Sequence, residues 1–484
     1  MKYCYTLLCC LIFSTSLLSQ SYSLTVSEGH GSNTYAVGDT VYIFSRALDD
    51  YEVFTHWTFS TENLTFVADQ GEWRTAFIMP NEGVEAKAHF AEVPSDFLTF
   101  ESMRTSSIVQ PFYTAFQEDA KGTVFILHGT GGGVSGWSDQ RRGDSFQMVK
   151  DLYYAGYSVV IPESQESTLR EDLNNDGRIR WVSFPTDTLT NIDYQNLKIA
   201  IDSFERRGAL DREELFSIGM SSGGSFSGAF SITFETVASA IYCATSQLGV
   251  AQSTESNLQW CLMPNDPVMG LNGIETVKSY AEILKDRRLC SNVFVNRLFP
   301  IYPALFQRAG LSATASAAVF EELVRNGFTD DDYIIQAPVE ELLSRIQSRP
   351  NDWQVLRSLP ISMLNGIGSL LSVAYGEHQF FANHNLRTIR FFNHACLATS
   401  IPPILKRFSK NRHLKIHPNP SSGQIELVDL ENPFNWTLYS IDGTPIRSEQ
   451  GWRDRYITLA VEAGLYLLAV EVEGQVKVER VVVF

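Results

Sequence analysis

The chain has 484 residues, of which 44% are hydrophobic and 19% are charged. This composition supports a sizeable buried core and excludes an intrinsically disordered chain. Lys and Arg number 38 against 55 Asp and Glu, so the net charge is −17 and the sequence pI is about 5.0. A surface this acidic argues against a nucleic-acid partner, because gripping a phosphate backbone requires clustered positive charge.

The first residues have the pattern of a secretory signal peptide, which we predict over residues 1–22. Lys2 gives a positive start, an apolar run covers residues 7–18, and small polar residues follow at 19–21. The run is too short to cross a bilayer as a stable helix, and no later stretch reaches ~20 apolar residues. We therefore expect an exported mature chain without a transmembrane segment. A buried N-terminal helix is the alternative.

Three of the seven cysteines lie inside the predicted signal peptide, and four remain in the mature chain: Cys243, Cys261, Cys290 and Cys396. In an oxidising compartment an even number is compatible with one or two disulfides. Four cysteines allow three pairings, among which the sequence does not choose. Reduced, buried thiols are the alternative. No C-x-x-C pair or His-rich spacing indicates a zinc site.

Three zones follow the signal peptide. Residues 23–93 contain short alternating strands broken by Gly and Asn, residues 94–410 alternate strands with helical stretches, and residues 413–484 return to short strands and turns. Strands that alternate with helices indicate βαβ units and a parallel sheet. The pattern therefore predicts an α/β domain with a doubly wound, mostly parallel sheet, flanked by a small N-terminal β-domain and a C-terminal β-sandwich.

The N-terminal zone contains GHGS at 29–32, YAVG at 35–38, FTHW at 54–57 and FIMP at 77–80, followed by an alternating strand at 84–90. This order resembles the small β-modules related to the internalin B-repeat, which are accessory domains of bacterial surface proteins. The resemblance implies a spacer or an adhesive domain. A β-domain with no ligand of its own is the alternative.

The C-terminal zone contains PNPSSG at 418–423, WTLYSIDG at 436–443, GLY at 464–466 and an alternating tail at 476–483. Strands of period two with one apolar face indicate a small β-sandwich. The zone is similar to the C-terminal sorting domain of the Por (type IX) secretion system. The resemblance implies that the type IX machinery is a partner, and that the mature protein is secreted or reaches the cell surface. A plain binding sandwich is the alternative.

Two glycine-rich turns in the middle zone carry the chemistry. A buried strand at 125–127 leads into HGTGGG at 128–133, and a strand at 215–218 leads into GMSSGG at 219–224. The second turn is a G-x-S-x-G motif in which Ser221 sits between a strand and a helix, where larger neighbours would clash with the crossing backbone. The pattern predicts a nucleophilic serine, and a purely structural turn is the alternative.

A serine hydroxyl needs a base, so an acid and then a histidine must follow it in the chain. Asp266 follows the strand at 258–263 and precedes a predicted helix, where the orienting acid belongs; a turn aspartate before proline is the alternative. His378 lies in a loop-like segment before the last helix and is the predicted base. His384 is the next candidate, and both His384 and His394 lie on or near that helix.

The middle zone resembles the α/β-hydrolases, with H-G-x-G-G, G-M-S-S-G, N-D-P-V and G-E-H in the order of that family. It is most similar to secreted carboxylesterases of the polyhydroxyalkanoate-depolymerase and feruloyl-esterase kind. The resemblance implies that Ser221 is the nucleophile, His378 the base and then the acid, and Asp266 the orienting carboxylate. It implies no required cofactor.

The same resemblance implies an oxyanion hole formed by two backbone N–H groups. One belongs to Ser222 and the other to the loop of Gly129, Thr130 and Gly131. Removing one such donor typically lowers the rate by ~10²–10³, so this loop matters as much as the three side chains.

The predicted acid and base are unusually far apart, since Asp266 and His378 are separated by 112 residues in the sequence numbering. We predict a helical insertion over about 291–371, with helices at 317–325 and 339–347, that acts as a cap over the site. Three aspartates at 330–332 lie between these helices. One of them is a rival for the acid, although a capping cluster is the simpler interpretation.

Residues 172–179 match the start of an EF-hand-like calcium loop, with oxygen ligands at Asp172, Asn174 and Asp176 before the turn at Gly177. The twelfth position is Ser183 instead of a bidentate Glu, which weakens the match. The pattern therefore leaves two interpretations, a structural calcium site and an ordinary polar Asx-turn loop.

Together these features predict a secreted serine hydrolase that cleaves a carboxylic ester through an acyl-enzyme. The ester is a small molecule, a polysaccharide-linked ester or a polyester. A serine peptidase on the same fold is one alternative, because attack on amides and esters uses the same groups. A catalytically degenerate surface-binding protein is the other.

Overall fold

The computed structural model describes residues 20–394, apart from 107 and 140–142, and the strands of the C-terminal region between 415 and 483. Almost all of the predicted signal peptide lies outside the described residues, and its last two positions belong to the first strand. Contacts divide the chain into two units, residues 1–48 with 54–91 and residues 49–53 with 92–484. Among the described residues, no helix combines the length and the apolar character needed to span a membrane.

The N-terminal unit contains two four-stranded sheets. The first has the order β3-β1-β8-β5 and the second the order β2-β4-β7-β6. Along β8 the buried residues Val84, Ala86 and Ala88 alternate with exposed neighbours, as expected for a strand with one face in the core. The strands are β1 (Ser21–Ser27), β2 (Gly29–His30), β3 (Asn33–Ala36), β4 (Thr40–Ser45), β5 (Glu52–Phe59), β6 (Thr65–Phe66), β7 (Arg74–Ile78) and β8 (Val84–Glu92).

The second unit is built on an eight-stranded sheet with the order β16-β15-β14-β13-β11-β12-β10-β9. Six neighbouring strands, from β16 to β12, are parallel, and β10 is antiparallel to both of its neighbours. The bounds are β9 (Thr99–Arg104), β10 (Val109–Ala115), β11 (Thr123–Leu127), β12 (Ser158–Pro162), β13 (Leu215–Met220), β14 (Ala238–Tyr242), β15 (Asn257–Leu262) and β16 (Ser291–Val295). This is the α/β-hydrolase fold, as the sequence predicts.

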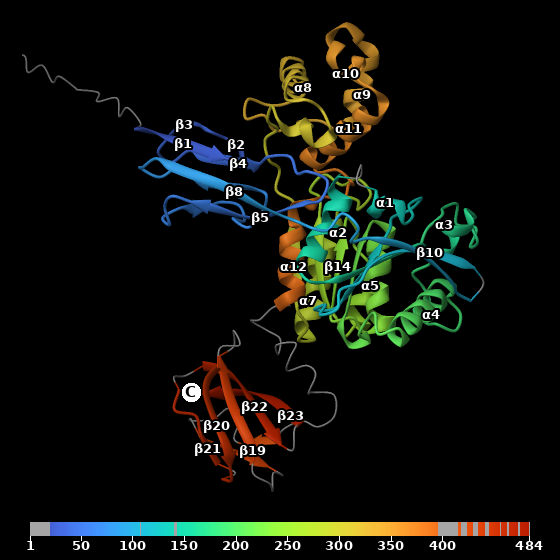
Figure 1. Ribbon diagram of the computed structural model, residues 1–484, viewed down its shortest axis with the longest axis vertical. Helices are drawn as coiled ribbons and strands as arrows, with labels where there is room; N and C mark the ends of the chain where they lie inside the picture. The colour runs from blue at the N-terminus through green and yellow to red at the C-terminus, as the bar shows by residue number, and fades with distance from the viewer. Residues whose placement is uncertain are drawn as a thin grey trace, which may run out of the picture. The chain divides into compact units, whose positions relative to one another are not determined.

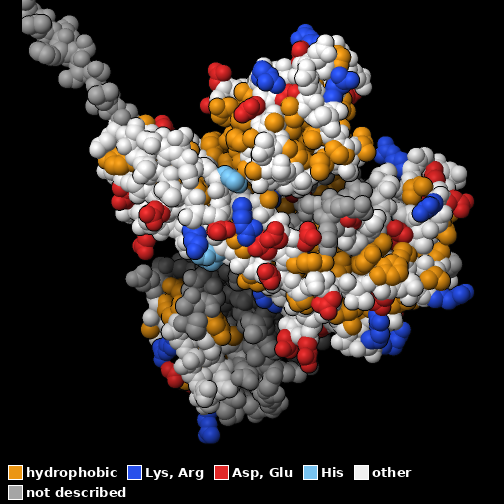
Figure 2. Space-filling view, turned by 45° about the horizontal axis from the view of Figure 1, so that its top comes forward, with side chains coloured by type: hydrophobic (Ala, Val, Ile, Leu, Met, Phe, Trp, Pro, Cys, Tyr) orange, Lys and Arg blue, Asp and Glu red, His pale blue; other side chains and the backbone are white. Residues whose placement is uncertain are grey.

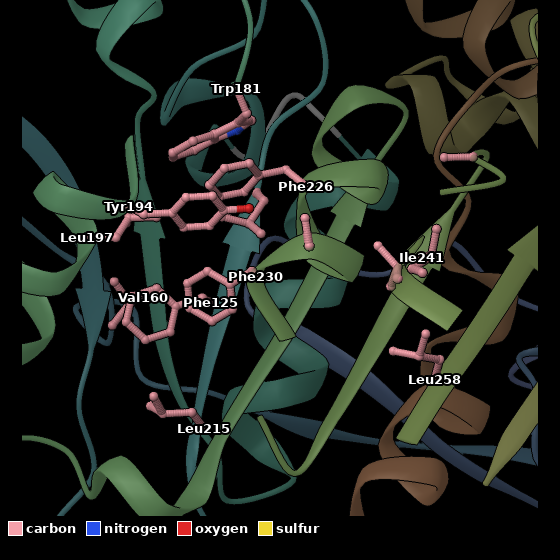
Figure 3. Packing of buried hydrophobic residues seen from close by; sticks show 14 of the residues in the cluster. Phe125, Val160, Trp181, Tyr194, Leu197, Leu215, Phe226, Phe230, Ile241 and Leu258 are labelled. Atoms are coloured by element: carbon pink, nitrogen blue, oxygen red, sulfur yellow. The ribbon is translucent and has the colours of Figure 1, made fainter. Parts of the chain in front are cut away.

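Helices cover both faces of this sheet (Figure 1). The helices α4 (Ile192–Arg206), α5 (Ser222–Phe234) and α7 (Gly273–Asp286) share one buried cluster with the strands, in which the rings of Tyr194 and Phe226 stack 4.8 Å apart (Figure 3). The helices α2 (Gly143–Tyr154) and α12 (Asn385–His394) contact each other on the opposite face. Successive residues of β13 show the alternation, because Leu215 joins the first cluster while Phe216 packs on Phe392 of α12.

A helical insertion separates β16 from α12 (Figure 1). Its start differs from the prediction, because residues 291–295 pair with β15 as an edge strand before the helices begin. The last helix also continues beyond 371, to Tyr375. Figure 2 shows hydrophobic side chains over much of the visible face of the insertion. Tyr333, Leu343 and Ile361 are among the exposed hydrophobic residues of the insertion. Its main helices are α8 (Ala313–Arg325), α9 (Val339–Ser348), α10 (Gln354–Ser358) and α11 (Ile361–Tyr375).

Short helices complete the second unit. They are α1 (Ser135–Ser138), α3 (Gln165–Leu169), α6 (Leu248–Ser253), η1 (Arg212–Glu214), η2 (Leu305–Ala309), η3 (Pro350–Asp352) and η4 (Ala382–His384).

The C-terminal region consists of two small sheets, with the orders β17-β18-β21 and β20-β19-β22-β23. Buried side chains of both sheets, among them Ile425, Trp436 and Leu468, form one hydrophobic cluster, which makes the region a sandwich. The PNPSSG segment at 418–423 lies outside the described residues. The strands are β17 (Lys415–His417), β18 (Gln424–Val428), β19 (Phe434–Ser440), β20 (Pro445–Trp452), β21 (Tyr456–Thr458), β22 (Gly464–Val472) and β23 (Gln475–Val483).

Candidate active site

Ser221 occupies a sharp turn between β13 and α5. Its backbone has φ 58° and ψ −123°, a conformation that is costly for a residue with a side chain. The flanking glycines are required by the crossing backbone. A Cβ on Gly219 would lie 2.0 Å from the carbonyl oxygen of Gly223, and a Cβ on Gly223 would lie 2.2 Å from that of Leu127. The turn therefore places the serine hydroxyl at the carboxyl edge of the sheet, at the N-terminal end of α5.

The structure brings the three predicted side chains together in one hydrogen-bonded chain. His378 Nε2 lies 2.8 Å from Ser221 Oγ, and His378 Nδ1 lies 2.7 Å from Asp266 Oδ2. A carboxylate only accepts hydrogen bonds, so Nδ1 carries the ring proton and Nε2 accepts from the serine hydroxyl. The Asp266 side chain is 1% exposed and that of His378 is 19% exposed. The imidazole is thus in the tautomer that can remove a proton from Ser221.

Asp266 is fixed by the turn that follows β15, where its Oδ1 accepts a 2.8 Å hydrogen bond from the N–H of Val268. The neighbouring Asn265 fastens this turn to the end of the insertion. Its backbone N–H donates to the carbonyl of Gly376 at 2.9 Å, and its side-chain amide donates to that of Tyr375 at 2.6 Å. The loops that carry the acid and the base are therefore fastened together immediately beside both side chains.

Glu377 connects the base to the helical insertion. Its carboxylate accepts a 2.7 Å hydrogen bond from the Ser372 hydroxyl of α11 and a longer one, 3.4 Å, from the N–H of Val339. Val339 is the first residue of α9, whose N-terminal N–H groups favour a negative charge. One side chain next to His378 thus contacts two helices of the insertion.

The glycine-rich loop after β11 lies against Ser221, since a Cβ on Gly129 would be 3.5 Å from Ser221 Cβ. The Thr130 hydroxyl donates to Ser222 Oγ at 3.1 Å, so the loop and the start of α5 are joined. Within the described part of the chain, the backbone N–H groups of Thr130 and Ser222 have no hydrogen-bond acceptor. The N–H of Gly131 instead donates to the carbonyl of Ile179 at 2.8 Å. Of the predicted loop residues, Gly131 therefore has its N–H in a hydrogen bond that leaves it unavailable to an oxyanion.

His128, which opens this loop, has a structural role that the sequence did not reveal. Its Nε2 accepts from the N–H of Ser164 at 3.1 Å, so Nδ1 carries the proton and donates to the carbonyl of Gly129 at 2.8 Å. The ring lies 5.0 Å from that of Trp181. Burial lowers the pKa of His128 to about 4, so the ring stays neutral and holds the loop near physiological pH.

The other candidate residues lie in separate elements. His384 lies in η4, where its ring packs 5.0 Å from that of Phe381, and His394 is the last residue of α12. Asp330 forms a turn in which its carboxylate accepts from the N–H groups of Asp332 and Ile334. The capping interpretation of this aspartate cluster therefore agrees with the structure.

The calcium-like loop is closed by its own hydrogen bonds. Asp172 accepts from the N–H groups of Asp176 and Gly177, and Asn174 also accepts from that of Asp176. Asp176 Oδ2 forms a salt bridge with Arg180 at 2.6 Å. An Arg charge at this position opposes a bound cation. The donor set therefore fits an Asx-turn loop better than a calcium site.

The cysteines are in different states. Cys290 is in a disulfide bond, whereas Cys243 and Cys261 are free and buried. Cys243 is the residue after β14, with φ 49°, and its thiol lies 3.3 Å from the carbonyl oxygen of Gln379, the residue after His378. Burial, with a smaller contribution from the Asp266 charge, raises the pKa of the Cys243 thiol well above its usual range. Its place beside the triad was not predictable, because nothing local marks the end of β14.

No family model matches the chain, and no curated protein matches it. Solved structures with a similar fold include an esterase of Pyrococcus furiosus, at 12% identity and a TM-score of 0.32, covering 43% of this chain and 84% of that one. A ferulic acid esterase has 10% identity and a TM-score of 0.32, with coverage of 41% and 89%. A Rhizomucor miehei esterase has 12% identity and a TM-score of 0.30, with coverage of 42% and 75%. Similarities this distant transfer no activity to the chain.

Proposed function

We propose that the protein is a secreted serine hydrolase that cleaves carboxylic esters through an acyl-enzyme on Ser221. The observation that carries the proposal is the unbroken chain of hydrogen bonds from Ser221 through His378 to Asp266. An alcohol is a weak nucleophile until a base takes its proton, and this arrangement supplies the base and the group that orients it. The ester is a small molecule, a polysaccharide-linked ester or a polyester.

In the acylation step, Ser221 Oγ attacks the ester carbonyl carbon while its proton passes to His378 Nε2. The carboxylate of Asp266 stabilises the imidazolium that forms. The carbonyl oxygen becomes an anion, and the N–H groups of Thr130 and Ser222 are the donors we assign to it. The C–O bond then breaks, and the alcohol leaves with the proton from Nε2. Water repeats the sequence on the acyl-enzyme and releases the carboxylic acid.

Labelling with a fluorophosphonate probe tests the nucleophile, because the probe reacts with an activated serine. We expect the full chain to be labelled and the Ser221→Ala variant to remain unlabelled. Ser225→Ala, one turn further along α5, is the matched control and keeps the label. Equal labelling of the Ser221→Ala variant would refute the assignment.

Substrate class is decided by hydrolysis rates on p-nitrophenyl acyl esters and on peptide anilides. The proposal expects cleavage of the esters and little cleavage of the anilides. Faster cleavage of the anilides would favour the peptidase alternative. A correctly folded chain with no labelling and no hydrolysis would favour the degenerate, surface-binding alternative.

Export by the type IX route is part of the proposal and depends on residues 413–484. The support is the resemblance of their sequence, together with a sandwich that has its own buried cluster. In a bacterium that has this secretion system, we expect the full chain outside the cell and a chain lacking 413–484 in the periplasm. Secretion of the truncated chain would contradict the assignment.

A further inference from the structure

We propose that Cys243, Asp266 and His378 form an inhibitory site for a soft divalent cation such as Zn²⁺. One ligand atom of each residue, the Cys243 Sγ, a carboxylate oxygen and a ring nitrogen, lies within 4.8 Å of the other two. Thiolate, imidazole and carboxylate are the three protein ligands that Zn²⁺ takes. The inference rests on the proposed function for its consequence, since the cation would regulate that same site.

The spacing is close to that of a metal site. Zinc bonds of about 2.0–2.3 Å place the ligand atoms of a tetrahedral site roughly 3.5 Å apart. The longest of the three separations, at most 4.8 Å, therefore has to shorten by no more than about 1.3 Å, and the 2.7 Å between His378 Nδ1 and Asp266 Oδ2 has to lengthen by about 0.8 Å. Of the three residues, His378 is the partly exposed one, with 19% of its side chain exposed, and Cys243 and Asp266 are buried.

Cys243 has no part in the hydrolytic mechanism. Its thiol lies against Gln379, whose carbonyl oxygen is 3.3 Å from Sγ, so it faces the loop that carries the base. A serine hydrolase needs no thiol at this place. The cysteine therefore adds the one ligand that turns an acid–base pair into a three-ligand site.

Binding would block the base by changing its tautomer. His378 Nε2 faces Ser221, so the cation takes Nδ1, which lies beside Asp266. The proton on Nδ1 moves to Nε2, and the thiol of Cys243 releases its proton to solvent as the S–metal bond forms. His378 then presents an N–H to Ser221 and cannot accept its proton. No oxidant or reductant takes part.

The test uses the full chain with two readouts. The first is the hydrolysis of a p-nitrophenyl ester during titration with Zn²⁺ and after removal of Zn²⁺ with EDTA. The second is the ultraviolet thiolate-to-metal absorption on titration with Cd²⁺, which needs no enzymatic activity. We expect reversible inhibition and a thiolate band in the full chain.

Variants of Cys243 test whether its thiol is the metal ligand. Cys243→Ala should lose the band and raise the inhibition constant for Zn²⁺ at least tenfold, measured against the variant's own uninhibited rate. Cys243→Ser retains a donor for the Gln379 carbonyl and should behave in the same way. Cys261→Ala, which removes the other buried free thiol, is the matched control and should keep both the band and the inhibition.

The outcomes separate this inference from the proposed function. A thiolate band that needs Cys243, in a chain without ester hydrolysis, would support the metal site and count against the hydrolase. Ester hydrolysis that is insensitive to Zn²⁺, with no band in the full chain, would overturn the metal site and leave the hydrolase standing. Unchanged Zn²⁺ inhibition in both Cys243 variants would also overturn it.

Discussion

Gly223 illustrates how a single position controls the geometry of the nucleophile. A Cβ at this position would meet the carbonyl oxygens of Leu127 and His128 at 2.2 and 2.3 Å. Neither neighbour can move easily, because Leu127 is in the central strand β11 and His128 holds the loop that follows it. Gly223 therefore allows the turn that carries Ser221 to lie close to the glycine-rich loop after β11.

We predict that Gly223→Ala lowers the free energy of unfolding by about 1–3 kcal/mol or more, because backbone atoms must shift to accept the methyl group. Chemical denaturation measures this change. Gly249→Ala is the matched control, since a Cβ there meets nothing within 4 Å and the position lies in α6. Equal stability of the two variants would contradict the clash.

A hydrogen bond between the hydroxyl groups of Thr130 and Ser222 joins the two residues whose backbone N–H groups we assign to the oxyanion. We expect Thr130→Val and Ser222→Ala each to lower kcat about three- to tenfold with little change in KM, because a lost hydrogen bond of about 1 kcal/mol loosens donors that act on the transition state. Steady-state kinetics on an ester measure the effect. The double variant should be no slower than either single one, and additive losses would show that the two hydroxyls act separately.

At this scale the sequence predicted more than it left open. The proximity of Ser221, Asp266 and His378 was predictable because a nucleophile, an acid and a base are expected in that order after particular strands. The sequence could not show that Thr130, and not Gly131, has a free N–H for an oxyanion. The N–H of Gly131 donates to the carbonyl of Ile179, which belongs to a distant segment. Contacts between distant segments leave no local pattern in the chain.

The elements of the sheet show the same division. The strand predicted at 258–263 is β15 (Asn257–Leu262), shifted by one residue at each end, because a short apolar run between turn residues is a strong local pattern. The helical insertion was placed too early, since residues 291–295 form the edge strand β16. A short apolar run at a sheet edge and the start of a helical region look alike until the neighbouring strand is known.

Glu377 gives a test of how the insertion is held. We predict that Glu377→Ala frees the start of α9 and the end of α11, because the variant loses a charge-assisted hydrogen bond worth about 1.5–3 kcal/mol. Hydrogen exchange in these two helices should become faster, and kcat should fall because His378 is the next residue. Glu340→Ala, an exposed change in the first turn of α9, is the control. Unchanged exchange in the Glu377 variant would show that the carboxylate does not hold the insertion.

The stability of the whole molecule should depend on pH through buried groups. The pKa of His128 falls from 6.5 to about 4 on burial, so between these values the unfolded chain binds a proton that the folded protein does not. The free energy of unfolding therefore decreases as the pH falls through this window, by about 2 kcal/mol at pH 5. The buried carboxyls of Asp151 and Asp193, whose pKa values burial raises to about 6, act in the opposite direction.

Comparison with a His128→Gln variant isolates the imidazole. When the pH is lowered from 7 to 5, the native sequence should lose about 2 kcal/mol more of its free energy of unfolding than the variant does. The reason is that only the native chain, when unfolded, has this imidazole to protonate. Denaturation in urea at the two pH values gives both numbers. An identical pH response in the two proteins would refute the neutral state assigned to His128.

The bonds from Asn265 to Tyr375 and Gly376 have a consequence for how such a chain can diversify. They connect the end of the insertion to the turn after β15. The segment between Val295 and Tyr375 is therefore an insertion whose C-terminal end is held by hydrogen bonds to the body of the sheet. Such an insertion can change in length or sequence while these bonds keep Asp266 and His378 at hydrogen-bonding distance. If the insertion covers the site, as we predict from the sequence, the segment that shapes the pocket could then change while the proposed catalytic residues stay in place.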